Sequence, residues 1–325
     1  MDIQTLASAV IDGDRRALSR AITLVESARA DHREQAAELL EALSKSGRQA
    51  LRIGLSGTPG VGKSTFIESF GMSLIAQNQR VAVLAVDPSS TRSGGSILGD
   101  KTRMDRLSRE RQAFSRPSPS QTHLGGVARR SREAVAVCEA AGFDVVLIET
   151  VGVGQSETVV AQMADLFVLL LAPAGGDELQ GVKRGIMEMA DLILINKADG
   201  DLKSAAMRTM ADYAGALRLL RKRVQDPEDF PKALSVSAME ENGLEAAWSE
   251  MQALIEWRRR EGFFGATRSE QSRFWFEEDV RQALLAKLST AGPLKDAMDA
   301  LGHSVAQGEI TPAMATQRMQ AILQA

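Results

Sequence analysis

Residues 57–64 have the composition and spacing of a loop that binds phosphate groups. They read Gly-Thr-Pro-Gly-Val-Gly-Lys-Ser, a complete G-x-x-x-x-G-K-S motif. Glycines let backbone N–H groups turn inward around a polyphosphate, and a following helix adds the positive end of its dipole. We expect the ammonium of Lys63 to reach the β- and γ-phosphates and the hydroxyl of Ser64 to bind Mg²⁺. The expected nucleotide contacts are Gly57, Thr58, Pro59, Gly60, Val61, Gly62, Lys63, Ser64 and Thr65.

A second motif indicates which base is bound. Asn196-Lys197-Ala198-Asp199 directly follows the apolar run 192–195, as expected at the carboxyl end of a buried parallel strand. The Asp199 carboxylate could accept hydrogen bonds from guanine N1–H and the exocyclic amine, whereas adenine lacks this pair of donors. Asn196 would brace the loop and the Lys197 stem would cover the base. Ser237, Ala238 and Met239, after the strand expected at 233–236, form the expected loop at the guanine edge.

Acidic residues end two further apolar runs. Residues 143–149 predict a strand that ends in Glu149, and residues 81–87 predict one that ends in Asp87. With Asp100, these residues are three acids that could surround one Mg²⁺–phosphate site, although Mg²⁺ prefers one or two protein oxygens. Not all three need be ligands, because one could orient the attacking water. Gly152, in the sequence Glu-Thr-Val-Gly, could offer its N–H to a γ-phosphate as part of a switch.

The elements that would position these residues alternate along 49–262. A strand at 51–56 precedes the phosphate loop and a helix at 65–76 follows it. Further strands are expected at 81–87, 143–149, 166–172, 191–195 and 232–236. Alternating strands and amphipathic helices predict an α/β fold with a mostly parallel sheet covered on both faces. In this region Asp144 is interpreted as a solvated strand start, and the basic run 218–223 as the solvated face of a helix.

Two helical regions flank this expected GTPase domain. Residues 1–48 predict packing helices, one capped by residues 12–14 and one over about 32–45. Residues 263–325 predict a helical arm that starts at a break around Gly262, with further helices over about 294–301 and 313–323. The arm has too little surface to form its own core, so it needs the rest of the chain or a second subunit. The aromatic residues Phe274, Trp275 and Phe276 are therefore interpreted as packing residues of a core or a dimer contact.

Composition narrows the class of protein. The 325 residues carry a net charge of −3, which argues against a general binder of nucleic acid or anionic membranes. No apolar run is long enough to span a membrane and residues 1–10 do not resemble a secretory signal, so a cytoplasmic location is expected, or the mitochondrial matrix in a eukaryote. Cys138 is the only cysteine and is interpreted as a core residue. It and three scattered histidines lack the spacing of a zinc or nickel site.

Several long blocks resemble one family. They are 87–104 (DPSSTRSGGSILGDKTRM), 116–120 (RPSPS), 124–128 (LGGVA), 149–157 (ETVGVGQSE) and 176–181 (GDELQG). The chain thereby resembles the MeaB/ArgK-type GTPases, chaperones of adenosylcobalamin-dependent methylmalonyl-CoA mutase within the SIMIBI class of P-loop NTPases. The resemblance covers nearly the whole chain.

This resemblance implies more than the motifs. It places Lys63, Ser64, Asp87, Asp100 and Glu149 around the phosphates and metal, with Lys63, the three acids and Gly152 as the expected catalytic set and Ser64 and the three acids as the expected metal ligands. Blocks 88–104 and 150–160 correspond to switches I and II, and 174–185 to a switch III that couples the nucleotide to the mutase, with Asp177 and Lys183 as candidate relays. A homodimer through the C-terminal arm is implied.

The expected activity is hydrolysis of GTP to GDP and phosphate, with Mg²⁺, slow alone and stimulated by the mutase. GTP would gate or protect the loading of adenosylcobalamin. Two alternatives remain at this point, a nickel-type metallochaperone GTPase and an arginine or small-molecule kinase.

Overall fold

The computed structural model describes residues 2–86, 104–116, 124–150, 156–173, 184–289 and 292–324. The chain divides into two compact units, Met1–Gln271 and Ser272–Ala325. The boundary falls inside the long helix α11 (Phe263–Ser289). The three regions expected from the sequence, with breaks near 48 and 262, remain a prediction.

The first unit is built on a parallel sheet. Its described strands are β1 (Leu51–Gly57), β2 (Val81–Val86), β3 (Ala113–Arg116), β4 (Val145–Thr150), β5 (Leu166–Leu171), β6 (Leu192–Ile195) and β7 (Lys232–Ser235), in the order β3-β2-β4-β1-β5-β6-β7. Every pair of neighbours runs parallel. Most strands are buried apolar runs, as a sheet covered on both faces requires. The expected α/β class and six strands are confirmed, while the short edge strand β3 was not predicted.

The connections between the strands reverse direction at β1, the strand that leads into the phosphate loop. From β1 the chain passes to β2, β3 and β4 on one side, and it then crosses to β5, β6 and β7 on the other. Parallel sheets bind ligands outside their carboxyl edge where the direction of strand order reverses. The loop after β1 therefore lies where this sheet is expected to hold a ligand.

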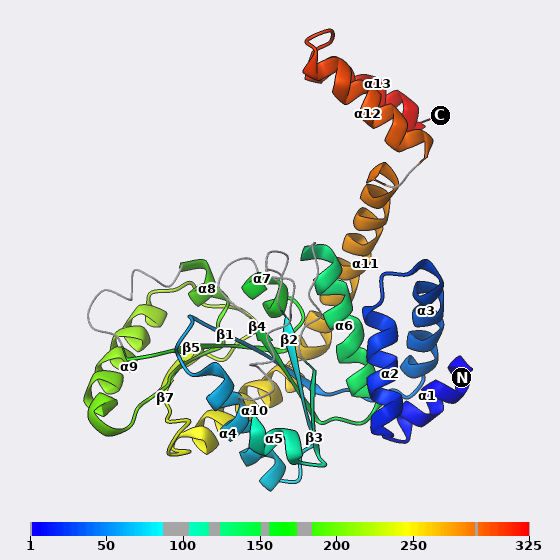
Figure 1. Ribbon diagram of the computed structural model, residues 1–325. Coiled ribbons are helices and arrows are strands. Elements are labelled where there is room, and N and C mark those ends of the chain that lie inside the picture. The colour runs from blue at the N-terminus through cyan, green and yellow to red at the C-terminus, as the bar shows by residue number, and fades with distance from the viewer. Residues whose placement is uncertain are drawn as a thin grey trace. The chain divides into compact units, whose positions relative to one another are not determined.

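Helices cover both faces of the sheet (Figure 1). Those of the first unit are α1 (Ile3–Ile11), α2 (Arg15–Glu26), α3 (Ala30–Ser44), α4 (Lys63–Ala76), α5 (Asp105–Arg109), α6 (Leu124–Ala140), α7 (Ser156–Ala161), α8 (Arg184–Met189), the 3-10 helix Gly200–Leu202, α9 (Lys203–Arg218) and α10 (Leu244–Arg260). Helices α4 and α10 lie on one face and α6, α7 and α8 on the other. Within α4, Phe66 stacks on Phe70 with 5.3 Å between ring centroids, and Trp248 of α10 meets Phe70 edge-on at 5.9 Å.

The N-terminal helices pack as the sequence predicts. Asp14 caps α2, its carboxylate accepting a hydrogen bond of 2.7 Å from the N–H of Ala17. Such a cap satisfies one of the N–H groups that a helix start leaves without a partner. Helices α2 and α3 lie beside α6 (Figure 1), and their apolar faces are buried.

Three aspartates fix the amino edge of the sheet. Asp144, Asp165 and Asp191 directly precede β4, β5 and β6. Each carboxylate accepts a hydrogen bond from the backbone N–H at the start of a neighbouring strand, at 2.7 Å from Arg80, 2.8 Å from Arg52 and 2.7 Å from Phe167. Asp144 is exposed as expected, and it also has this bonding role, which the sequence did not show.

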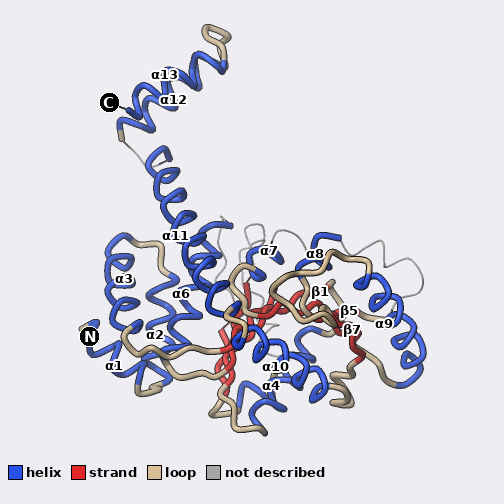
Figure 2. Tube along the Cα trace, turned by 180° about the vertical axis from the view of Figure 1, so that it is seen from behind, coloured by secondary structure: helices blue, strands red, loops and turns tan. Residues whose placement is uncertain are grey.

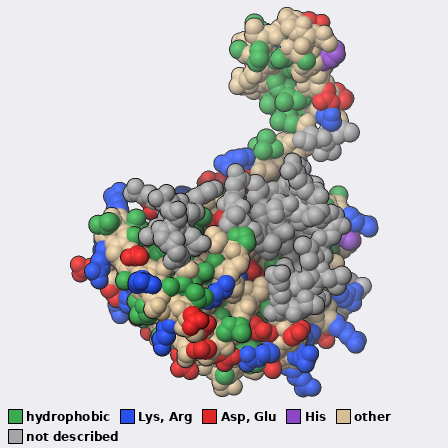
Figure 3. All heavy atoms as spheres, turned by 60° about the vertical axis from the view of Figure 1, so that its left-hand side comes forward, with side chains coloured by type: hydrophobic (Ala, Val, Ile, Leu, Met, Phe, Trp, Pro, Cys, Tyr) green, Lys and Arg blue, Asp and Glu red, His purple; other side chains and the backbone are tan. Residues whose placement is uncertain are grey.

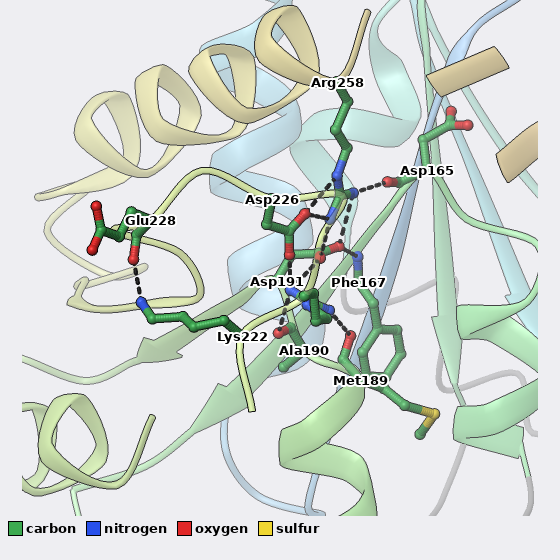
Figure 4. A network of polar contacts seen from close by, with 10 residues as sticks. Asp165, Phe167, Met189, Ala190, Asp191, Lys222, Asp226, Glu228 and Arg258 are labelled. Atoms are coloured by element: carbon green, nitrogen blue, oxygen red, sulfur yellow. Dashed lines mark hydrogen bonds and ion pairs between the residues drawn. The ribbon is translucent and has the colours of Figure 1, made fainter. Parts of the chain in front are cut away.

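A buried ionic network holds α10 against this amino edge (Figure 4). The Arg258 guanidinium donates to the carboxylates of Asp191 and Asp226, both at 2.6 Å, and to the Asp165 carbonyl at 2.7 Å. Burial alone would lower the pKa of Arg258, but the two carboxylates outweigh it and raise that pKa. Figure 2 shows the chain from behind, with α10 and α4 below the strands β1, β5 and β7.

The interpretation of the basic run 218–223 as the solvated face of a helix is wrong. Helix α9 ends at Arg218, so most of the run lies beyond the helix. Arg223 is not on a solvated face, because its guanidinium contacts Asp191 at 2.9 Å and Asp226 at 2.6 Å.

Cys138 is fully buried as predicted, and burial raises the pKa of its thiol.

The second unit consists of the end of α11, α12 (Pro293–Ala306) and α13 (Pro312–Gln324). Within it Phe274 and Trp275 meet edge-on, with ring centroids 5.0 Å apart. Helix α12 continues five residues beyond the expected end at 301. None of the helices in the described ranges combines the length and apolar character needed to cross a membrane.

Candidate nucleotide-binding site

The phosphate loop connects β1 to α4, as the motif predicts. Gly60 and Gly62 have φ angles of +85° and +87°, in the left-handed region that glycine adopts without strain. A side chain at Gly57 would also clash, because a Cβ there would lie 2.4 Å from the Leu170 carbonyl oxygen. The loop therefore depends on glycine both for its turn and for its close approach to β5.

Lys63 and Ser64 are the first two residues of helix α4. The ammonium of Lys63 donates to the Gly57 carbonyl at 2.6 Å, across the base of its own loop. Thr58, Pro59 and Gly60 are exposed, Val61 is buried, and Ser64 and Thr65 are half-buried. These residues lie at the helix N-terminus, where unpaired N–H groups and the helix dipole favour an anion.

The Asn-Lys-Ala-Asp segment lies against this loop. The Asn196 side chain, at the end of β6, donates to the Val61 carbonyl at 2.9 Å and accepts from the Ala238 N–H at 3.0 Å. Lys197 donates to the Gly60 carbonyl at 2.7 Å. Motifs more than 130 residues apart in the sequence therefore share one site.

The loop after β7 orients the acid expected to select the base. The Ser237 hydroxyl donates to the Asp199 carboxylate and accepts from the N–H of Glu240 at 3.0 Å. Ala238 is buried and Met239 is 76% exposed. A residue that the sequence did not indicate, Ser69 of α4, donates to the Ala238 carbonyl at 2.7 Å. It follows no motif spacing, so no signal in the sequence could have found it.

Glu149 lies in β4, in register with Leu55 of β1 and Ala85 of β2. Its side chain is 8% exposed. Next to it along the strand, Thr150 donates to the Ser56 hydroxyl at 3.1 Å. The strand ends at Thr150, one residue later than predicted. The structure thus places Glu149 beside the strand that leads into the phosphate loop.

Other residues assigned from the sequence lie outside the described ranges. They are Asp87, Asp100 and Gly152, and also Asp177 and Lys183 of the expected third switch. Within the described ranges, no cluster of three or more His, Cys, Asp or Glu side chains could hold a metal ion. The expected set Asp87, Asp100 and Glu149 is not tested by that finding.

The described residues fit a magnesium nucleotide. At Gly60 no described residue lies within 4 Å of where a Cβ would stand. Two ammonium groups, a helix N-terminus and a serine hydroxyl supply positive charge and one oxygen ligand, the donor set that a phosphate-bound Mg²⁺ uses together with water. A parallel sheet with this loop after its central strand defines the class of P-loop NTPases.

Comparison with known proteins identifies the family. The family model described as "Methylmalonyl Co-A mutase-associated GTPase MeaB" matches residues 18–293. A "Putative GTPase" of Caulobacter vibrioides is 50% identical over 321 residues, covering 99% of this chain and 98% of the relative. A mouse protein named "Methylmalonic aciduria type A homolog, mitochondrial" is 45% identical over 96% of this chain and 77% of its own. The chain belongs to the MeaB family of GTPases.

A solved structure agrees over the same length. The crystal structure described as "LAO/AO transport system kinase" superposes with a TM-score of 0.78 at 35% identity, covering 99% of this chain and 98% of that one. The fold and the family expected from the sequence are therefore confirmed.

Proposed function

We propose that this chain binds GTP with Mg²⁺ and hydrolyses it to GDP and phosphate. One observation carries the proposal, namely that Asn196 and Lys197 donate hydrogen bonds to the phosphate loop at Val61 and Gly60. A loop for phosphates and a loop for guanine are thereby joined at the carboxyl edge of one sheet. Membership of a GTPase family supports the same activity.

In this proposal each described residue has a role set by its position. The phosphate loop would surround the phosphates with backbone N–H groups, and Lys63 would exchange its Gly57 carbonyl for phosphate oxygens. Asp199, held by Ser237, would accept from guanine N1–H and the exocyclic amine. Ala238 and Met239 would border the base. Catalysis would depend mostly on positioning and charge neutralisation.

The metal site is proposed from Ser64 and Glu149, with Asp87 and Asp100 from outside the described ranges. Mg²⁺, when bound, would neutralise charge on the phosphates. Glu149 is buried beside the strand that leads into the phosphate loop, so it could bind the metal through water or hold the attacking water in place. Gly152 would offer its N–H to the γ-phosphate. These roles agree with the residue types and with the register of β1, β2 and β4.

The proposed output of hydrolysis is a change in the association with methylmalonyl-CoA mutase. The family description supports the client. GTP would gate or protect adenosylcobalamin loading, through switches at 88–104, 150–160 and 174–185. A cytoplasmic location, or the mitochondrial matrix in a eukaryote, remains a prediction alongside it.

We also propose a homodimer through the C-terminal arm. Apolar side chains remain exposed on the part of α11 in the second unit and on α12 and α13, and Figure 3 shows apolar groups on the surface of this unit. Phe276, Val280 and Leu284 recur every fourth residue, so they share one helix face, and Phe276 is 68% exposed. A face of this kind supports contact with another protein chain.

The experiment compares GTP with ATP in the purified chain. Release of free phosphate from GTP, with little from ATP, would support the proposal. Addition of arginine tests the kinase alternative, which the kinase description of the similar structure favours. Transfer of the γ-phosphate to arginine, or equal use of ATP, would contradict the proposal. Tight stoichiometric nickel binding would instead favour the metallochaperone alternative.

A further inference from the structure

A buried arginine lies where α6 meets the N-terminal helices. Arg130, in the second turn of α6, is 6% exposed. Its Nε is buried and has no hydrogen-bond partner among the residues that the structure describes. A buried charged group is costly unless it is paired and hydrogen-bonded, and each such group calls for an explanation.

The carboxylates near Arg130 are already engaged by other arginines. Glu133 accepts both hydrogen bonds of an Arg33 fork, at 2.9 and 2.6 Å. The Glu26 carboxylate accepts two hydrogen bonds from the Arg116 guanidinium, at 3.3 and 2.5 Å. Both pairs have the bidentate geometry that makes such contacts strong. The two acids therefore leave little capacity for Arg130.

Positive charge exceeds negative charge at this place. Arg129 also approaches Glu133, at 3.8 Å, so among the described residues four arginines face two glutamates. Burial lowers the pKa of Arg130, and the neighbouring charges of Arg129 and Arg33 lower it further, more than Glu133 and Glu26 restore it. Both the geometry and the charge balance favour an additional anion.

We propose that Arg130, with Arg129 beside it, forms a site for an oxyanion, either a phosphate group or a carboxylate. Guanidinium groups bind both through paired N–H donors in a fixed plane. The site is separate from the proposed nucleotide site, because Arg116 ends β3 and two strands, β2 and β4, lie between β3 and β1. The proposal therefore does not depend on GTP binding.

The test uses the full chain saturated with GDP, so that the phosphate loop is occupied. Inorganic phosphate and acetate are titrated separately at constant ionic strength, and binding is measured by calorimetry. Arg130→Gln removes the charge at the site. Arg208→Gln removes the same charge at an exposed position of α9 and serves as the matched control. Retained GDP affinity in both variants shows that they are folded.

We expect saturable binding of phosphate or acetate that Arg130→Gln weakens about tenfold or more, since it removes charge-assisted hydrogen bonds, and that Arg208→Gln leaves unchanged. Preference for phosphate would indicate a phosphorylated small molecule, and equal binding of acetate an acidic side chain of a partner. No saturable binding of either anion would overturn the proposal. Equal loss in the two variants, or no loss in Arg130→Gln, would overturn it too.

Discussion

At the scale of single residues, Asp199 carries the choice of base in the proposed site. Its carboxylate accepts from Ser237 and can accept from guanine. In Asp199→Asn an amide N–H₂ would replace one acceptor, which opposes the guanine amine but suits the carbonyl of xanthine. We expect GTP affinity to fall about a hundredfold or more and XTP to bind better than GTP. Competition binding against labelled nucleotide measures both.

A nearby acid provides the control for that prediction. Asp201 is exposed and lies two residues further along the chain. Asp201→Asn makes the same change in charge and should leave both affinities unchanged. If Asp199→Asn also left the preference for GTP unchanged, Asp199 would not read the base.

Substitutions at Gly60 and Gly62 distinguish the cost of backbone strain from the cost of a clash with Asn196. Their φ angles are nearly equal, so Ala at either position costs about 1–2 kcal/mol of strain. Among the described residues, a new Cβ at Gly62 would also meet a neighbour, Asn196 Nδ2 at 2.9 Å, whereas one at Gly60 would meet none within 4 Å. In denaturant unfolding without nucleotide, Gly62→Ala should therefore lower the free energy of unfolding more than Gly60→Ala. Equal losses would show that Asn196 does not depend on Gly62.

At the scale of elements, the ionic network around Arg258 should hold α10 to the amino edge of the sheet. Arg258→Met removes the more buried of the two arginines that pair with the carboxylates of Asp191 and Asp226. We expect the free energy of unfolding to fall by about 3–5 kcal/mol. Denaturant unfolding followed by tryptophan fluorescence would measure this, because Trp248 and Trp257 lie in α10.

Arg260→Met is the matched control in the same helix. Among the described residues Arg260 pairs with the adjacent Glu261, and its side chain is largely exposed. The Arg260→Met substitution should change the free energy of unfolding by less than about 0.5 kcal/mol. A loss in Arg258→Met no larger than in this control would show that the network does not stabilise the fold.

Elements that bury a continuous apolar run could be predicted from the sequence. Residues 81–86, 166–171 and 192–195 are such runs, and the phosphate loop and the Asn-Lys-Ala-Asp segment identify their own strand ends. Strand β3 could not be predicted in this way, because Ala113–Arg116 has four residues and its last two are only half-buried.

The ionic network was not predictable for a different reason. Arg258 pairs with acids 32 and 67 residues away, and no local periodicity marks such pairs. One signal is present in hindsight, since Met-Ala-Asp-Leu occurs at 163–166 and again at 189–192, each time at the start of a buried strand. The two aspartates have the same task of binding a neighbouring strand.

At the scale of the whole molecule, the exposed face of α11 should determine the oligomeric state. Leu284→Glu places a charge on this face, where the side chain is 58% exposed in the single chain. A dimer formed through the arm would dissociate, so the mass from light scattering should halve. Gln282→Glu, exposed on the same helix, should keep the mass of the unmodified chain. An unchanged mass in Leu284→Glu would contradict dimerisation through this face.

The central claim is that GTP hydrolysis by this chain responds to its client. The most direct measurement is the steady-state rate of GTP turnover by the purified chain, alone and with saturating methylmalonyl-CoA mutase from the same organism. We predict slow turnover alone, because the sequence motifs indicate neither an in-line glutamine nor an arginine finger, and a several-fold increase with the mutase. A rate that stays the same at saturating mutase would contradict the claim, even if GTP remained the preferred nucleotide.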